Sequence, residues 1–295
     1  MKVGFFTSTF SDRPVEEVLG FAVEAGFDAV EFDARSHIKS PAAVAATVKS
    51  AQDRGLFVSS IALTGNQLEP DLSKRADLRV ETLEYAEAVA DCGVQVFVIF
   101  PGRDPGLAED DNYKIFADHA NTLLAATAAS KLSIAIENWP GPRNDYIVTT
   151  PDGWRRAFAL IPDPRFGLEF DPSHLLRLGV DPYPALVEAK ERVKILHGKD
   201  TSIDAERLQA VGYYGSGWWR YRLPGRGMLD WTKFLREAQG FGFDGVISIE
   251  HEDLDFGWPR KDLDARKEGE RKGLEFLRKT LARLEPRVGE KGQTN

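Results

Sequence analysis

The stretch Arg165–His174, RFGLEFDPSH, decides the fold. Residues 166–170 form a short, mostly apolar run that is typical of a buried strand, and Pro172 stops that strand directly after Asp171. Three other apolar runs end in the same way, each on a side chain that can bind a metal: 134–137 on Glu137, 193–197 on His197 and 246–250 on Glu250. Four strands with a ligand-type residue at the C-terminal tip predict parallel strands whose tips share one site.

Strand-like and helix-like runs alternate along the whole chain. The predicted strands are residues 2–10, 29–32, 56–63, 94–100, 132–137, 166–171, 193–197 and 246–250. Strands that alternate with helices pair in parallel through right-handed crossovers, and eight such units close a barrel. We therefore predict a single-domain α/β protein, a (β/α)8 TIM barrel over residues 1–286, followed by a disordered polar tail at residues 287–295.

The composition argues against several classes of protein. The chain has 295 residues, of which 42% are hydrophobic, so it can bury a large core. Its formal net charge of -8 argues against a nucleic-acid binder, which usually carries excess positive charge. Cys92 is the single cysteine, so no disulfide framework is expected. Without an apolar run of about 18 residues or a signal-peptide pattern at the N-terminus, we expect a cytoplasmic protein that does not enter a membrane.

The four strand tips carry residues that suit a metal. Side chains alternate between the two faces of a strand, and the C-terminal strand ends of a TIM barrel surround the active site. Glu137, Asp171, His197 and Glu250 can therefore all point into the barrel mouth. Three carboxylates and one imidazole suit one divalent metal, Mn²⁺ before Mg²⁺ or Co²⁺, better than a closed zinc site with thiolates. The alternative is that each acid only caps a helix or meets a surface arginine. This alternative suits any one residue by itself, but it explains poorly why all four lie at strand tips.

Two further acids have no firm place in this scheme. Glu169 lies two residues before Asp171, and we favour either a position on the outer face or a structural ion pair over a second carboxylate behind the metal. Glu31 follows the segment 26–30, GFDAV, which echoes GFDGV at residues 242–246. This echo places Glu31 out of phase with Glu250, so Glu31 receives no role.

The longest irregular region, residues 201–227, contains a run of aromatic and basic residues, WWRYR at 218–222. Long loops after barrel strands are usually functional. We predict that Trp219 and Arg222 belong to a lid that binds the substrate, since aromatic rings cover the apolar faces of sugars, with an oligomer contact as the alternative. Lys199 shares the face of His197, and it either holds a substrate oxygen or pairs with Asp200.

Several short motifs give the chain a family resemblance that covers nearly its whole length. They are Ile136–Asn138, Phe170–His174, His197–Asp200, Pro224–Gly227 with Asp230 and Trp231, and Ile249–Asp253. With these motifs the sequence resembles the xylose-isomerase-like TIM-barrel superfamily, the sugar phosphate isomerase and epimerase group. The motifs are specific for the superfamily and do not identify a substrate.

The resemblance to the ketose 3-epimerases of this superfamily implies roles for individual residues. It implies that Glu137, Asp171, His197 and Glu250 bind one divalent metal, that Glu137 and Glu250 also move protons, and that His174 contacts a substrate oxygen. The chain departs from the epimerases at two substrate-contacting positions, which here are Arg143 and Ile203. Arg220 or Arg222 could replace the arginine that the epimerases carry at the second of these positions.

The expected activity is therefore that of a metal-dependent isomerase or epimerase that acts on a ketose or keto-sugar through an enediolate. The same enediolate also supports a lyase or dehydratase on a keto-inositol or 3-keto-glycoside. Catalytic subunits of C-glycoside deglycosidases resemble the superfamily and work with a small partner, so either a homo-oligomer or a small accessory subunit stays open. A sugar-binding barrel without activity is less favoured, because all four ligand residues are present.

Overall fold

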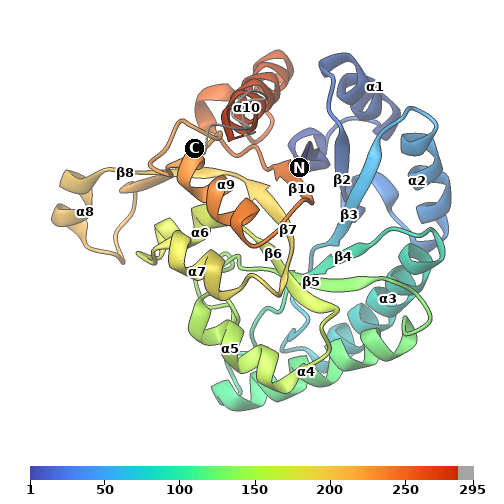
Figure 1. Ribbon diagram of the computed structural model, residues 1–295. Helices are drawn as coiled ribbons and strands as arrows, with labels where there is room; N and C mark the ends of the chain where they lie inside the picture. The colour runs from blue at the N-terminus through green and yellow to red at the C-terminus, as the bar shows by residue number, and fades with distance from the viewer. Residues whose placement is uncertain (285–295) are drawn as a thin grey trace, which may run out of the picture.

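The computed structural model describes residues 1–284, and within them eight parallel strands close into a barrel (Figure 1). The barrel strands are β1 (Lys2–Phe6), β2 (Ala29–Asp33), β3 (Phe57–Leu63), β4 (Val96–Ile99), β5 (Ser133–Glu137), β6 (Phe166–Phe170), β7 (Val193–Gly198) and β10 (Val246–Ile249). Sequence neighbours pair around the ring, and β10 closes it against β1. The predicted (β/α)8 fold is confirmed. The tail predicted at residues 287–295 lies outside the described part of the chain.

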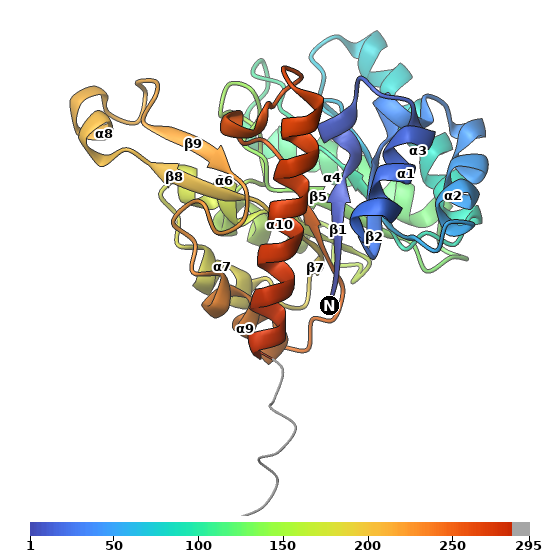
Figure 2. The same ribbon diagram turned by 90° about the horizontal axis from the view of Figure 1, so that it is seen from above.

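Helices surround the barrel on its outer side (Figures 1 and 2). They are α1 (Val15–Ala25), α2 (Val44–Gln52), α3 (Leu72–Asp91), α4 (Glu109–Ala126), α5 (Pro151–Leu160), α6 (Pro172–Arg177), α7 (Pro182–Glu188), α9 (Trp231–Gly240) and α10 (Leu263–Leu284), with short helical turns at Thr7–Phe10, Ala34–Ile38, Pro41–Ala43 and Leu254–Phe256. Between Met1 and Leu284, none of the helices has the length and apolarity of a membrane span.

Helix α9 shows how the sequence produces these elements. The side chain of Asp230 accepts a hydrogen bond from the backbone N–H of Lys233 and so caps the first turn. The apolar residues that follow at helical spacing are all buried against the barrel: Trp231, Phe234, Leu235 and Ala238. One face of the helix is therefore fixed to the core, and its polar face is left to solvent.

The region predicted as an irregular loop contains a β-hairpin instead. Strands β8 (Asp200–Ile203) and β9 (Trp219–Arg222) pair antiparallel, with Asp200 opposite Arg222, and a short helix α8 (Ala205–Val211) lies between them. Figure 2 shows this hairpin projecting from the barrel. The sequence concealed it because fifteen residues separate the strands, and no two-residue turn signal marks the reversal.

The barrel interior is apolar at its base and polar at its mouth. Ala29, Ile195 and Val246 form a buried cluster at the N-terminal ends of their strands. The polar residues of the interior lie further along the strands, toward the C-terminal ends. This apolar cluster separates the base of the barrel from the polar groups at the mouth, where TIM barrels carry their active sites.

Candidate active site

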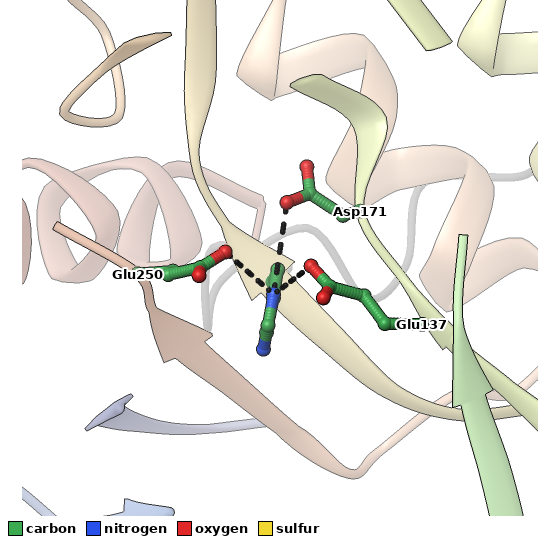
Figure 3. Close-up of side chains that lie close together, drawn as sticks. Glu137, Asp171 and Glu250 are labelled. Atoms are coloured by element: carbon green, nitrogen blue, oxygen red, sulfur yellow. Dashed lines mark ion pairs between the residues drawn. The ribbon is translucent and has the colours of Figure 1, made fainter. Parts of the chain in front are cut away.

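The four predicted metal ligands lie together at the barrel mouth. Glu137 ends β5, His197 lies in β7, and Asp171 and Glu250 directly follow β6 and β10. One ligand atom from each residue lies within 4.8 Å of the others. The Nδ1 atom of His197 is 3.2 Å from Glu250 Oε2, 3.3 Å from Glu137 Oε1 and 3.6 Å from Asp171 Oδ2. In Figure 3 the carboxylates of Glu137, Asp171 and Glu250 point toward a common centre.

The donor atoms of this cluster fit a divalent cation. Asp171 caps helix α6 through Oδ1, which accepts a hydrogen bond of 2.7 Å from the N–H of Ser173, so Oδ2 is left to face the cluster. Asp171 Oδ2 and His197 Nδ1 are buried and have no hydrogen-bond partner among residues 1–284. The ammonium group of Lys199, 3.1 Å from Asp171 Oδ2, offsets part of the negative charge, and a divalent cation would give both atoms a partner. Three carboxylate oxygens and one imidazole nitrogen are a ligand set that hard divalent metals accept.

Two carboxylates lie behind His197 and orient its ring. His197 Nε2 is 3.2 Å from Glu31 Oε2 and 3.2 Å from Glu169 Oε1. An Nε2–H that points at carboxylates leaves Nδ1 as the nitrogen that faces the mouth, as metal-binding histidines require. Glu31, Glu169 and His197 thus form a second layer beneath the first.

The positions of Glu31 and Glu169 correct two expectations. Gly4 pairs with Ala29 on one side and with Ser248 on the other, so Glu31, two residues after Ala29, lies level with Glu250 and in phase with it. The GFD echo reflects similar turns before the two strands and does not fix their stagger in the barrel. Glu169 faces inward and is fully buried, so it is a carboxylate behind the metal cluster and does not lie on the outer face.

The charges in this buried layer determine where protons lie. Burial alone would lower the pKa of His197, but the charges of Glu169 and Glu31, together with the nearby carboxylates of Asp171 and Glu137, raise that pKa well above its usual value. Burial and the neighbouring charge of Glu31 raise the pKa of Glu169. Burial would also raise the pKa of Glu31, but His197 lowers it. Glu31 is therefore the ionised partner of His197, and Glu169 holds a proton.

Two more predicted residues, His174 and Lys199, lie beside the cluster. His174 Nε2 is 3.1 Å from Glu137 Oε1 and 3.3 Å from Asp171 Oδ2. Lys199 Nζ is 3.1 Å from Asp171 Oδ2, forms an ion pair with Glu250 and lies 3.1 Å from Glu252 Oε2. Lys199 therefore faces the mouth and does not pair with Asp200.

Asp200 instead fixes the loop that follows the hairpin. Its carboxylate accepts hydrogen bonds from Trp231 Nε1 at 2.9 Å and from the N–H of Leu229 at 3.1 Å. It also accepts one from the N–H of Thr201 at 2.8 Å. Burial raises the pKa of Asp200, and these hydrogen bonds oppose the rise.

A cleft of about 480 Å³ leads from the cluster to solvent. Glu137, Glu250, Glu252 and Lys199 lie in it, and its further lining consists of Phe6, Ser8, Ser11, Asp33, Thr64, Phe100, Trp139, Trp258, Pro259 and Arg260. The cleft thus runs over the ends of β1 to β5, β7 and β10, with aromatic walls and polar groups between them. Such a mixture of apolar surface and few polar groups is typical of a small-molecule site.

The structure does not place Trp219 and Arg222 in this cleft, which corrects the predicted lid. Arg222 donates hydrogen bonds to Asp253 Oδ1 at 2.9 Å and to Asp255 Oδ2 at 2.6 Å. Trp219 lies beneath the guanidinium of Arg177, 4.0 Å from it. Neither residue is among the described residues that line the cleft. The sequence could not show this, because the hairpin carries Trp219 to Arg177 of α6 and carries Arg222 to the acids that follow β10.

Asn138 is a functional candidate that the sequence interpretation missed. Its Nδ2 donates to the backbone carbonyl of Asp171 at 2.9 Å, and its Oδ1 accepts from the backbone N–H of Asp171 at 2.8 Å. The amide thereby joins the tips of β5 and β6, which carry Glu137 and Asp171. Asn138 stood within a family motif, but no local pattern pointed to a partner 33 residues away.

Comparisons with known proteins agree with this architecture. The family model of the xylose isomerase-like TIM barrel matches residues 19–280. The uncharacterized protein YfiH of Bacillus subtilis (strain 168) is 26% identical over 301 residues, 86% of this chain and 93% of that protein. An inosose dehydratase of Lacticaseibacillus casei is 29% identical over 101 residues, 33% of this chain and 34% of that protein. A crystal structure of the 3-keto-D-glucoside 4-epimerase from E. coli has a TM-score of 0.69 at 19% identity, covering 95% of this chain and 99% of that chain.

The family model spans most of the barrel, from helix α1 into helix α10. The match therefore includes every strand tip of the candidate site except that of β1. It agrees with the family resemblance that the sequence motifs predicted. The chain belongs to the xylose isomerase-like TIM barrel family.

Proposed function

We propose that the protein is a divalent-metal-dependent sugar isomerase or epimerase that acts on a ketose or keto-sugar through an enediolate. One observation carries this proposal: the carboxylates of Glu137 and Glu250, from β5 and β10, flank one centre in the cleft (Figure 3). Moving a proton from one face of a carbon to the other requires two such groups. The E. coli relative with the same fold is named as an epimerase of a keto-glucoside.

Glu137, Asp171, His197 and Glu250 would hold the metal. Three oxygen ligands and one nitrogen, without thiolate, favour Mn²⁺, with Mg²⁺ or Co²⁺ as further candidates. When bound, the metal supplies positive charge that polarises a carbonyl and lowers the cost of negative charge on its oxygen. All of these ligands except Glu250 are almost fully buried, so they offer a site that is shielded from bulk water.

The residues of the chain then move the proton. Burial alone would raise the pKa of Glu250, but Lys199 and His197 lower it to about 2, so Glu250 is ionised and can act as a base. One of the two glutamates removes the proton beside the carbonyl, and the other returns it. Return to the opposite face gives an epimer, and return to the neighbouring carbon gives an isomer. His174 and Lys199, which contact the carboxylates of Glu137 and Glu250, would donate hydrogen bonds to substrate oxygens.

A lyase or dehydratase on a keto-inositol or 3-keto-glycoside is the second candidate. It is favoured by Glu252, a further carboxyl group in the cleft whose pKa is raised by burial and which lies 3.1 Å from Lys199. A carboxyl group that keeps its proton can deliver it to a leaving group. The inosose dehydratase relative carries out a reaction of this type by name. In this reading the enediolate loses a substituent from the next carbon.

Exchange of substrate protons with deuterium from solvent tests the proposal. The protein is incubated in D₂O with Mn²⁺ and a panel of ketoses, inososes and 3-keto-glucosides, and a chelator is added before NMR spectra are recorded. We expect deuterium at a carbon beside the carbonyl, only when metal is present. The product then separates epimerase, isomerase and lyase.

Matched variants separate chemistry from folding. Glu137→Gln and Glu250→Gln should each abolish turnover, because a carboxamide cannot accept the proton. Glu270→Gln makes the same change at a buried glutamate of α10, outside the cleft, and should keep activity. Full exchange in both Glu137→Gln and Glu250→Gln would refute the assignment.

A further inference from the structure

The β8–β9 hairpin contacts the candidate active site through the side chain of Tyr221. The hydroxyl oxygen of Tyr221 is 2.6 Å from His174 Nδ1, and its ring stands edge-on to the imidazole, with 5.2 Å between the ring centroids. The other imidazole nitrogen, Nε2, is the one that faces Glu137. Tyr221 thus holds the side of His174 that points away from the cluster.

The direction of the hydrogen bonds follows from Arg177. A guanidinium group can only donate, and Arg177 Nη1 lies 2.8 Å from the Tyr221 oxygen, which accepts this bond. The hydroxyl hydrogen of Tyr221 is then free for His174 Nδ1, and we take this nitrogen as its acceptor. In neutral imidazole the proton then lies on Nε2. That nitrogen lies 3.1 Å from Glu137 Oε1, which accepts the hydrogen, and 3.3 Å from Asp171 Oδ2. Lys199 Nζ also lies 3.3 Å from it, but an ammonium group cannot accept this hydrogen.

The hairpin holds Arg177 in the position that this arrangement needs. The guanidinium lies over the ring of Trp219 with 4.0 Å to its centroid, and it donates a second hydrogen bond to Asn144 Oδ1. The rings of Trp219 and Tyr221 pack against each other at 4.7 Å. Burial raises the pKa of Tyr221, against the opposing charges of Lys199 and Arg177, so the phenol keeps its hydrogen.

We propose that Tyr221 is a positioning residue that fixes His174 as the Nε2–H tautomer, so that His174 presents a hydrogen-bond donor to Glu137, which lines the cleft. Trp219 contributes by holding Arg177, which explains its place outside the cleft. The hairpin therefore acts as a support for the site and not as a lid. The catalytic consequence of this proposal rests on the proposed function, but the tautomer itself does not.

The tautomer can be measured directly by ¹⁵N NMR of the imidazole nitrogens. The full-length protein is labelled with ¹⁵N-histidine and studied with Mg²⁺, and the His174 signals are identified by their loss in His174→Gln, since the chain has only five histidines. We expect an unprotonated Nδ1 and a protonated Nε2 in the wild type. A protonated Nδ1 in the wild type would overturn the proposal.

Two variants test whether Tyr221 and Arg177 fix the tautomer of His174. Tyr221→Phe removes the hydroxyl, and Arg177→Met removes its donor, so each should give a mixture of tautomers or an Nδ1–H form. Tyr213→Phe makes the same change at a tyrosine of the hairpin that is 64% exposed and should leave the His174 spectrum unchanged. An unchanged tautomer in both Tyr221→Phe and Arg177→Met would contradict the proposal, even if one of them folds poorly.

Turnover separates this proposal from the proposed function. Removal of a group that orients an active-site side chain typically costs about 10- to 100-fold, so Tyr221→Phe should lower kcat by at least about 10-fold with little change in KM. A tautomer change in a protein without any metal-dependent exchange would support the positioning role and refute the function. Exchange with an unchanged tautomer and unchanged kcat would refute the positioning role alone.

Discussion

Replacing Asn138 with alanine should weaken both the fold and the metal site. The substitution removes two hydrogen bonds, of 2.9 Å and 2.8 Å, that join Asn138 to the backbone of Asp171. Asp171 is fully buried, so water cannot replace the lost partners. A buried polar group left without a partner costs about 1–3 kcal/mol, and two such groups give roughly 2–6 kcal/mol of unfolding free energy.

The same substitution should lower metal affinity, because Asn138 aligns the strand tips that carry Glu137 and Asp171. Loss of such an orienting contact typically weakens metal binding by about 10- to 100-fold. Urea unfolding of the metal-free protein measures the first effect, and calorimetric titration with Mn²⁺ measures the second. Stability within about 0.5 kcal/mol of wild type together with unchanged affinity would refute the reasoning.

Asn66→Ala is the matched control. Asn66 joins two loops in the same way, since Nδ2 donates to the carbonyl of Arg103 at 2.9 Å and Oδ1 accepts from the N–H of Arg103 at 3.0 Å. Asn66 does not contribute to the described cleft or to the metal cluster. This variant should therefore lose stability and keep its metal affinity. A loss of affinity as large as that of Asn138→Ala would show that the effect is a general loosening of the loops.

Three further predictions concern protons. The pKa of His197 is raised well above its usual value, so its imidazole is protonated at pH 7 in the metal-free protein. Metal binding at Nδ1 should therefore release about one proton, which calorimetry in buffers of different ionisation enthalpy measures. If no proton is released, His197 is not the ligand that we assign. Burial, together with the charge of Arg79, lowers the pKa of His119 to about 3 from 6.5, so the stability linked to it is present above pH 6.5 and is lost as pH falls toward 3. His119→Leu should remove about 2–3 kcal/mol of the loss between pH 7 and about pH 4.5, and an equally acid-sensitive variant would speak against this cause. Burial raises the pKa of Glu270 well above 4.5, so the stability linked to it is present below pH 4.5 and is lost as pH rises. Glu270→Gln keeps the hydrogen-bond acceptor for Thr9. Its midpoint of urea unfolding should lie above that of the wild type at pH 8 and close to it at pH 4.

The fold could be predicted because its signals are local. Each barrel strand is a short apolar run, each major helix carries a periodic apolar face, and proline, glycine or a capping acid marks most boundaries. The hairpin of β8 and β9 escaped because its strands are only four residues each and partly exposed, so they show neither a long apolar run nor a tight turn.

The sequence by itself determined that Glu137, Asp171, His197 and Glu250 meet. The strand period is two, and all four lie at C-terminal tips, which a closed barrel brings to one mouth. No knowledge of the packing was needed for this step, because local spacing and barrel closure together define the positions.

Only the tertiary structure decided what surrounds these four residues. The stagger of β2 against β1 sets whether Glu31 faces inward, and the path of the hairpin sets whether Tyr221 meets His174, 47 residues away. Lys199 likewise faces Glu250 and Glu252 because β7 and β10 are neighbours in the ring. These contacts depend on the relative placement of distant segments, which is fixed by packing across the whole barrel and leaves no trace in local periodicity.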